Sequence, residues 1–426
     1  MQSKRISLHL TATLAMFAAI MFATVTRVSA EESILHSFGS SSDGAEPSGS
    51  LIVDASGNLY GMTSRGGSAN SGTVFKLTPK TGGGWREKVL YSFLNNHQDG
   101  TSPGGSLVLD AKGRLYGTTT AGGSNNTGTV FKLTLQIGGV WKETVLHTFP
   151  NVNDRKDGIF PNGGLIFDAS GNLYGVTGSG GTRGNGTVFE LVPKSGGRWT
   201  EKILHNFTQG DKTDGRFPNS KLIFDAAGNL YGTTRDGGGG VCYLGCGTVF
   251  KLSQSGGVWS ETILHRFQND GEDGYQPYGD LIIDASGNLY GTTAWGGGPV
   301  HQFFGTVFEL TPQTGGTWAE NILYSFGNQG KDGERPFGGV VLDGAGNLYG
   351  TTFAGGTANF LGTVFKLAPQ TGGGWTQTLL HSFKAFNQDG TGPRTGLVID
   401  EAGNLFGTTL TGGGKANMGT VFEITH

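Results

Sequence analysis

Short apolar runs separated by glycine-rich turns recur along almost the whole chain. Leu51-Ile52-Val53 precedes the turn Asp54-Ala55-Ser56-Gly57, and Asn58-Leu59-Tyr60-Gly61 follows it. Aspartate at the first turn position, with glycine three residues later, predicts a tight hairpin between two antiparallel strands. Near copies begin at Asp110, Asp168, Asp225, Asp284, Asp343 and Asp400, and the aromatic at the seventh position recurs at steps of 56, 58, 57, 59, 59 and 57 residues. One module is therefore used seven times.

Each period contains enough apolar segments for four short strands. In the second period they are residues 107–109, 115–119, 128–133 and 141–149, here called strands a, b, c and d. The glycines fall between these segments, which is typical of many short strands and not of low-complexity sequence. Four antiparallel strands per period are the content of a propeller blade. The fold class is therefore all-β, with seven four-stranded blades.

The two ends of the repeat region are complementary. Residues 34–38 resemble the end of a strand d but stand before the first strand a, whereas residues 419–424 form a strand c that no strand d follows. The N-terminal strand therefore supplies the missing strand of the last blade. Closing the ring in this way removes the exposed sheet edges that an open array would carry.

Residues 1–30 have the features of a secretory signal peptide. Lys4 and Arg5 precede a mostly apolar stretch, and Val28-Ser29-Ala30 offers small residues for cleavage. An uncleaved membrane anchor is the alternative, although the stretch is barely long enough to span a bilayer. We expect export to the medium, the periplasm or the cell envelope.

Signal removal leaves residues 31–426 as one propeller domain with no membrane insertion. The formal net charge of −3 provides no basic surface for nucleic acid. We expect a monomer.

The pairing of Asp-x-x-Gly-Asn-Leu-Tyr-Gly-Thr-Thr with Gly-Thr-Val-Phe-Lys-Leu resembles the signature of the GloVer-repeat proteins, a group of exported bacterial proteins. The resemblance covers residues from about 34 to 426, with seven copies. It implies a propeller-like repeat protein at or beyond the cell surface, and no shared activity. Relatives often carry a C-terminal surface anchor, which this sequence does not show.

The only cysteines, Cys242 and Cys246, lie four residues apart in one glycine-rich loop. Because export permits disulfides and the loop offers few other metal ligands, we expect a bond between them. A metal site or a reactive thiol is the alternative.

Repeated ionisable residues are expected to serve the blade and not a site. Five histidines share one position of strand d with two tyrosines, and equivalent outer strands cannot bring them to one ion, so no metal site is predicted there. Lysines of strand c and glutamates of strand d suggest cross-strand pairs in some blades, but other blades carry two acids, so we expect solvated positions. These residues are His36, His147, His205, His265, His381, Tyr91 and Tyr324, with Lys76 and Glu87, Lys132 and Glu143, Lys251 and Glu261, Glu190 and Glu201, and Glu309 and Glu320.

Paired aspartates precede strand a in three blades. Such oxygen ligands could hold calcium, and the alternative is an aspartate-capped turn. No other cofactor is expected. The pairs are Asp154 with Asp157, Asp211 with Asp214, and Asp270 with Asp273.

Loop lengths vary on one face of the predicted disc only. The b-to-c spans, measured between glycines, are 11, 11, 11, 15, 14, 12 and 12 residues, whereas the a-to-b turn never changes. Blades four and five have the longest loops, and exposed aromatic and arginine side chains are typical of recognition surfaces. We therefore predict a ligand site at their shared rim, formed by Arg235, Asp236, Tyr243, Trp295, His301, Phe303 and Phe304.

The sequence favours a non-catalytic binding or scaffold module whose partner is a glycan or a protein. The alternative is a propeller-type enzyme such as a lactonase, lyase or glycosidase. Asp236 and His301 are the only candidate pair for proton transfer, and neither lies in a recognisable catalytic motif. The fold alone does not decide between these functions.

Overall fold

The structure is a computed structural model that describes residues 30–39, 42–154, 157–208, 214–298, 304–327, 329–357, 360–384 and 389–426. All but the last residue of the predicted signal peptide lie outside this part. Among the described residues, regular structure consists of strands and one short 3-10 turn, Ser195–Gly197. None of the described segments forms an apolar helix of bilayer-spanning length.

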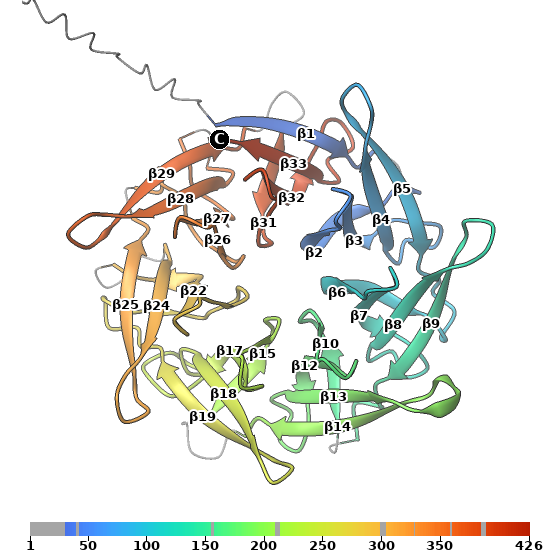
Figure 1. Ribbon diagram of the computed structural model, residues 1–426, viewed down its shortest axis with the longest axis horizontal. Coiled ribbons are helices and arrows are strands. Elements are labelled where there is room, and N and C mark those ends of the chain that lie inside the picture. Colours follow the sequence, from blue (N-terminus) through green and yellow to red (C-terminus); the bar gives the residue numbers. More distant parts are fainter. Residues whose placement is uncertain are drawn as a thin grey trace, which may run out of the picture.

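Seven antiparallel sheets of four or five strands stand around one axis, which confirms the predicted seven-bladed propeller (Figure 1). Blade one contains β2(Ala45–Val53), β3(Leu59–Arg65), β4(Thr73–Pro79) and β5(Trp85–Ser92), and blade two contains β6(Gly100–Leu109), β7(Leu115–Gly122), β8(Thr129–Leu135) and β9(Trp141–Thr148). Blade three contains β10(Gly158–Pro161), β11(Ile166–Phe167), β12(Leu173–Gly180), β13(Thr187–Pro193) and β14(Trp199–Asn206). Blade four contains β15(Gly215–Pro218), β16(Ile223–Phe224), β17(Leu230–Gly237), β18(Thr248–Ser255) and β19(Val258–Arg266).

The remaining blades follow the same order. Blade five contains β21(Ile282–Ile283), β22(Leu289–Thr293), β24(Thr306–Pro312) and β25(Trp318–Ser325), with a small sheet of β20(Gly274–Tyr275) and β23(Trp295–Gly296) beside it. Blade six contains β26(Val341–Leu342), β27(Leu348–Thr352), β28(Thr363–Pro369) and β29(Trp375–Ser382). Blade seven contains β30(Gly390–Pro393), β31(Val398–Ile399), β32(Leu405–Gly412), β33(Thr420–Thr425) and β1(Glu31–Ser37).

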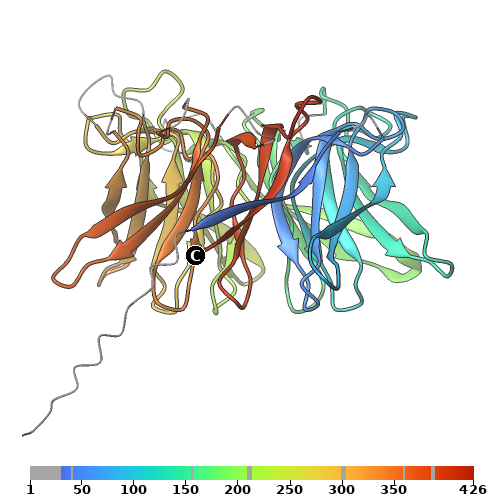
Figure 2. The same ribbon diagram turned by 90° about the horizontal axis from the view of Figure 1, so that it is seen from above.

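The N-terminal strand closes the ring as predicted. β1 runs antiparallel to β33, from the pair Glu31 and Thr425 to the pair Ser37 and Thr420 (Figures 1 and 2). The fully buried Phe38 follows β1, and its amide donates to the Gly419 carbonyl at 3.0 Å. β1 is thus the outer strand of blade seven, and it begins three residues earlier than the sequence pattern indicated.

The repeated turn of each module folds around its aspartate. Asp54 Oδ1 accepts hydrogen bonds from the amides of Ser56 and Asn58, and Asp54 Oδ2 accepts one from the Tyr60 hydroxyl at 3.0 Å. An aspartate side chain that bonds its own turn in this way fixes the hairpin geometry locally. In six modules one aspartate side chain thus holds both the turn and the tyrosine, whereas in the seventh Asp400 holds the turn alone beside Phe406.

The inner strands extend further than predicted. β6 begins at Gly100, not at Leu107, because the Asp-Gly-x-x-Pro segment also pairs with strand b. A register shift between Gly104 and Val108 interrupts the pairing, and four blades show two separate inner strands instead. This interruption breaks the alternation of apolar and polar residues from which strands are recognised.

A joint between neighbouring blades lies at the proline of each inner strand. The Phe160 amide donates to the Thr127 carbonyl of the preceding blade at 2.8 Å, and Pro161 packs against Gly128. The residue before the proline has a left-handed φ in all seven blades, between 53° and 62°, at Glu46, Ser102, Phe160, Phe217, Gln276, Arg335 and Gly392. The equivalent amides donate at 2.7–2.9 Å, and the bond from Glu46 to Met418 joins blade one to blade seven.

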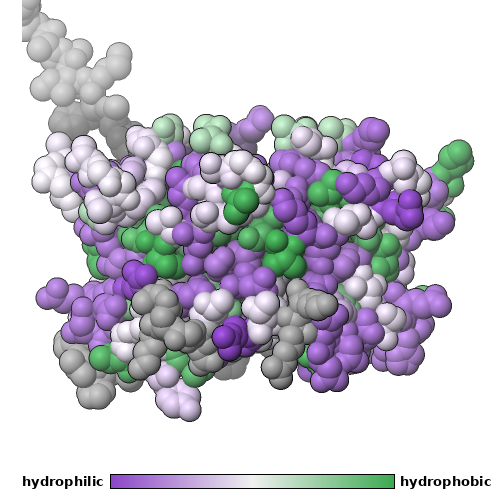
Figure 3. All heavy atoms as spheres, turned by 90° about the horizontal axis from the view of Figure 1, so that it is seen from below, coloured by the Kyte–Doolittle hydropathy of each residue, from purple (hydrophilic) through white to green (hydrophobic). Residues whose placement is uncertain are grey.

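The hydrophobic core lies between blades. Met62, Val74 and Phe93 of blade one pack against Leu115 and Phe131 of blade two. The rings of Phe93 and Phe131 meet edge to face with centroids 5.1 Å apart, a geometry that aromatic pairs prefer. On the side of the disc seen in Figure 3, hydrophobic side chains form small separate groups among hydrophilic ones.

Deletion of β1, residues 31–37, is expected to lower the melting temperature by several degrees or to cause aggregation. The deletion exposes the edge of β33, and an unpaired edge strand is a template for association between chains. Thermal unfolding and light scattering of protein without residues 1–30 measure both effects. A truncated protein that melts like the parent and stays monomeric would contradict this role for β1.

Candidate functional site

One face of the disc carries the b-to-c and d-to-a connections, and we call it the variable face. In Figure 2 it is the upper edge, whereas the lower edge consists of short hairpins. A cavity of about 770 Å³, here called the funnel, opens where the inner strands meet. Its wall includes residues on either side of the inner-strand prolines and the ends of strands b, among them Ser64, Thr120, Ser179, Arg235 and Leu410.

The funnel wall differs from blade to blade although its backbone repeats. Every blade contains the same Asp-Gly-x-x-Pro segment, so the backbone positions on both sides of the proline are equivalent. The side chains directly after the proline are nevertheless Ser48, Gly104, Asn162, Asn219, Tyr278, Phe337 and Arg394. A constant scaffold thus presents a non-repeated set of side chains to one cavity.

Aromatic rings and guanidinium groups lie together on this wall. The Tyr278 and Phe337 rings meet edge to face at 5.1 Å, and the Arg394 guanidinium lies 5.5 Å from the centre of the Phe337 ring. Arg235 stacks on Phe217 at 5.0 Å. Phe160 is 38% exposed, although its left-handed φ of 58° is unfavourable for a bulky side chain.

A hydrogen bond to a carboxylate joins the inner segments of blades four and five. The Lys221 amide donates to Asp280 Oδ1 at 2.7 Å, and burial raises the pKa of the Asp280 carboxyl. Asp280 lines the funnel. The equivalent positions of the other blades are Ser50, Ser106, Gly164, Gly339 and Gly396. Asp280 is therefore the one acidic side chain at this position of the seven blades.

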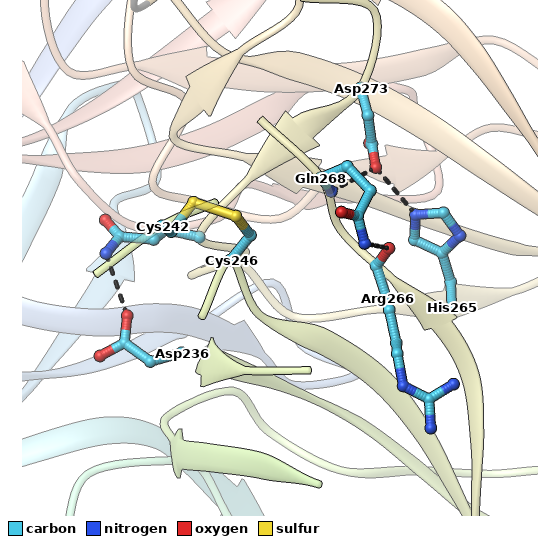
Figure 4. The surroundings of a disulfide bond; sticks show 8 residues. Asp236, Cys242, Cys246, His265, Arg266, Gln268 and Asp273 are labelled. Carbon is cyan, nitrogen blue, oxygen red and sulfur yellow. Dashed lines mark hydrogen bonds and ion pairs between the residues drawn. A yellow bond between two sulfur atoms is a disulfide. The ribbon is translucent and has the colours of Figure 1, made fainter. Parts of the chain in front are cut away.

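Of the residues predicted to form a ligand site, Arg235 lines the funnel. Its guanidinium contacts Asp236 Oδ2 at 2.9 Å, and Asp236 is only 1% exposed. The other oxygen of Asp236 accepts from Gln276 Nε2 at 3.0 Å (Figure 4). Asp236 therefore positions Arg235 and does not itself face the cavity.

Cys242 and Cys246 form a disulfide in the b-to-c loop of blade four (Figure 4). The neighbouring Tyr243 is 99% exposed and lines a separate cavity of about 140 Å³ together with Arg216. Because the larger funnel lies on the axis of the disc, Tyr243 is not part of it. The disulfide instead shapes the outer loop.

Trp295 and Phe304 lie at the joint of blades five and six. The Arg335 guanidinium stacks on the Trp295 ring at 4.6 Å, and the Phe304 carbonyl accepts from the Arg335 amide at 2.8 Å. His301 and Phe303 lie outside the described residues. The rim of blades four and five stays a prediction as a ligand site, and of its described members the structure brings only Arg235 to the funnel. The sequence analysis missed the other funnel residues. The signal that could have found them is the non-repeated residues on either side of the repeated proline.

The repeated histidines meet carboxylates of the next blade. His265 Nε2 lies 3.1 Å from Asp273 Oδ2 and 3.5 Å from Glu320 Oε2. Where a tyrosine takes the place of the histidine, its hydroxyl donates to the equivalent aspartate. Tyr91 donates to Asp99 at 2.8 Å, and Tyr324 donates to Asp332 at 2.7 Å. The expectation that the glutamates of strand d are solvated was therefore wrong, because they turn into the space between blades. We call each set of histidine, aspartate and glutamate an interblade triad.

Burial changes the acidity of these glutamates. It raises the pKa of Glu143 to about 8, helped by the charge of Asp99, and that of Glu261 to about 8. The pKa of Glu201 and of Glu320 is also raised, because each carboxyl is buried beside an aspartate. In the folded protein these glutamates hold a proton that they would lose in the unfolded chain at neutral pH.

The paired aspartates serve different partners where they are described. Asp270 Oδ1 accepts from the amides of Glu272 and Asp273 at 3.0 Å, as in a capped turn, whereas Asp273 faces His265. Asp211 lies outside the described residues. Calcium binding by these pairs stays a prediction.

The stability of the folded protein should fall as pH rises. A glutamate whose pKa is raised on folding contributes its full stabilisation below the unfolded pKa of about 4.5. This contribution is lost as the pH rises through the folded pKa. Replacement of Glu143 by glutamine removes one such group. Glu143→Gln should therefore raise the melting temperature at about pH 9 and leave it unchanged at about pH 5.

Gln377 occupies the equivalent position beside Tyr324 and Asp332, where its amide donates to the Asp332 carbonyl at 3.3 Å, so the fold accommodates this side chain. Calorimetry of parent and variant across this pH range is the measurement. An equal effect at both pH values would show that Glu143 is not protonated in the folded state.

Comparisons with known proteins give a matching repeat profile and several solved structures of low sequence identity. The luciferin-regenerating enzyme is 13% identical, with 76% of this chain and 91% of that chain covered and a TM-score of 0.44. A protein of unknown function from Dyadobacter fermentans is 12% identical, with coverages of 82% and 96% and a TM-score of 0.42, and a Lactobacillus plantarum protein is 14% identical, with 78% and 83% and 0.46. No curated protein matches the chain. The sequence profile of the Gloeobacter/Verrucomicrobia repeat matches residues 20–243 and 239–426. The chain belongs to this repeat family.

Proposed function

We propose that this protein is an exported, non-catalytic binding module that holds the end of a glycan in the funnel. The observation that carries the proposal is the contrast within one chain between a repeated backbone and non-repeated funnel side chains. Seven equivalent positions after the proline carry small, amide, aromatic and cationic groups. Structural positions such as the turn aspartates do not vary in this way.

The shape and lining of the funnel favour a glycan over a protein partner. Small-ligand sites occupy about 300–1,000 Å³, and the funnel falls within this range. A stable protein interface commonly buries about 800 Å² on each partner and is flatter. The amides of Asn162 and Asn219 offer donors and acceptors for sugar hydroxyls, and the exposed ring of Phe160 offers an apolar face for stacking. Arg394 adds a cation that suits an acidic sugar.

An enzyme remains the second candidate function because of Asp280. A carboxyl group with a raised pKa in a cavity is a candidate general acid in glycoside or lactone cleavage. Asp236 is less suited to this role because it is buried and bonded to Arg235 and Gln276. Turnover of polysaccharide or lactone panels that disappears in Asp280→Asn would favour the enzyme.

Two funnel variants test the binding proposal on a glycan array and then by titration with the glycan retained. Arg394→Ala and Phe160→Gly should each weaken binding by about 2 kcal/mol, or roughly thirtyfold, as loss of a hot-spot side chain does. Stability should change little. In Phe160→Gly the relief of about 1 kcal/mol of backbone strain offsets a similar entropic cost of glycine.

Tyr243→Ala is the matched control, because this exposed ring lies outside the funnel. It should bind like the parent. Trp295→Ala tests the alternative site at the rim of blades four and five. Binding that is lost in Trp295→Ala and kept in both funnel variants would overturn the funnel proposal.

A further inference from the structure

We propose that the interblade triad of His265, Asp273 and Glu320, together with three equivalent triads, binds a divalent transition-metal ion such as Zn²⁺ between adjacent blades. In each triad, one nitrogen and two carboxylate oxygens lie within 4.8 Å of one another. The other three are His147, Asp157 and Glu201; His205, Asp214 and Glu261; and His381, Asp389 and Glu32.

The separations between ligand atoms fit a shared ion. Zinc binds nitrogen and oxygen at about 2.0–2.2 Å, so tetrahedral ligands lie about 3.4 Å apart. His265 Nε2 lies 3.1 and 3.5 Å from its two carboxylates, and His205 Nε2 lies 3.7 and 3.6 Å from Asp214 and Glu261. The distances from His205 to Asp214 and Glu261 are too long for hydrogen bonds, but they suit a cation bound between the three side chains.

Unsatisfied buried atoms provide independent support. Asp273 is only 7% exposed, and its Oδ1 has no hydrogen-bond donor among the described residues. The same holds for Glu320 Oε1 and, in the next triad, for His205 Nε2. Buried polar atoms in native proteins nearly always have a partner, and two facing carboxylates need either a proton or a cation.

The chain also contains blade interfaces built without these ligands. At the interface of blades five and six, Tyr324 replaces the histidine and Gln377 replaces the glutamate. There Tyr324 donates to Asp332 at 2.7 Å, and Gln377 donates to the Asp332 carbonyl at 3.3 Å. Neutral donors thus satisfy that interface. Where imidazole and a second carboxylate occur instead, the donor set matches that of zinc sites.

The chemistry of the ligands selects the class of ion. Imidazole suits zinc and other first-row ions, whereas calcium prefers six to eight oxygen ligands. The two carboxylates neutralise the charge of a divalent ion, and water would complete the coordination. Binding requires the glutamate to be ionised, so each ion should displace its proton to the buffer.

The test is titration of the chelator-treated exported protein, free of a histidine tag, with ZnCl₂ at about pH 7.5 in two buffers of different ionisation enthalpy. We expect up to four ions per chain, release of protons and a higher melting temperature. Glu320→Gln and Glu261→Gln should each remove one ion from the stoichiometry. Calcium chloride should not reproduce these effects.

Glu143→Gln is the matched control, because Tyr91 replaces the histidine of that interface, and it should keep the parent stoichiometry. His265→Tyr copies the tyrosine found in two blades and provides a second variant expected to fold. The absence of zinc binding by the parent would overturn the proposal. Unchanged stoichiometry in Glu320→Gln and His265→Tyr, or calcium binding that these variants abolish, would also overturn it.

Discussion

The joint at each inner-strand proline is the interaction on which the ring depends. An amide in the left-handed region reaches a carbonyl of the preceding blade, and the proline fills the space over a glycine that has no Cβ. At Gly247 an added Cβ would lie 2.6 Å from Pro277 Cδ, which is closer than packed atoms can approach. Because the bond from Glu46 to Met418 repeats this contact across the closure, blade seven meets blade one as every other pair meets.

This joint also explains why the funnel side chains can differ. The backbone amide and the proline ring make the contact between blades, so this contact does not depend on the side chains beside them. Phe160, Gln276 and Gly392 occupy one equivalent position with nearly the same φ. Sequence variation is therefore permitted where the inner strands surround the cavity, and it is restricted at the turn aspartates and glycines.

The sequence predicted the blades, their number and the closing strand because these depend on local periodicity and on complementary ends. The turn at Asp54 carries all the information for its hairpin within a few residues. The funnel and the triads could not be predicted in this way. Glu320 of blade five meets His265 of blade four, and no local pattern distinguishes a glutamate that faces this gap from one that faces water. Arg235 was recognised as unusual, but its place at the axis depends on the meeting of all seven inner strands.

The pairing of β1 with β33 imposes an order on folding. The Thr425 hydroxyl donates to the Glu31 carbonyl, and these residues are 394 positions apart in the sequence. Contacts between such distant residues form late, because the loop they close must be ordered first. During synthesis β1 is made long before its partner β33, and six blades can assemble before β33 is available. The chain therefore behaves as an open array with one unpaired strand until its last residues emerge, and it becomes a ring only in its final folding step.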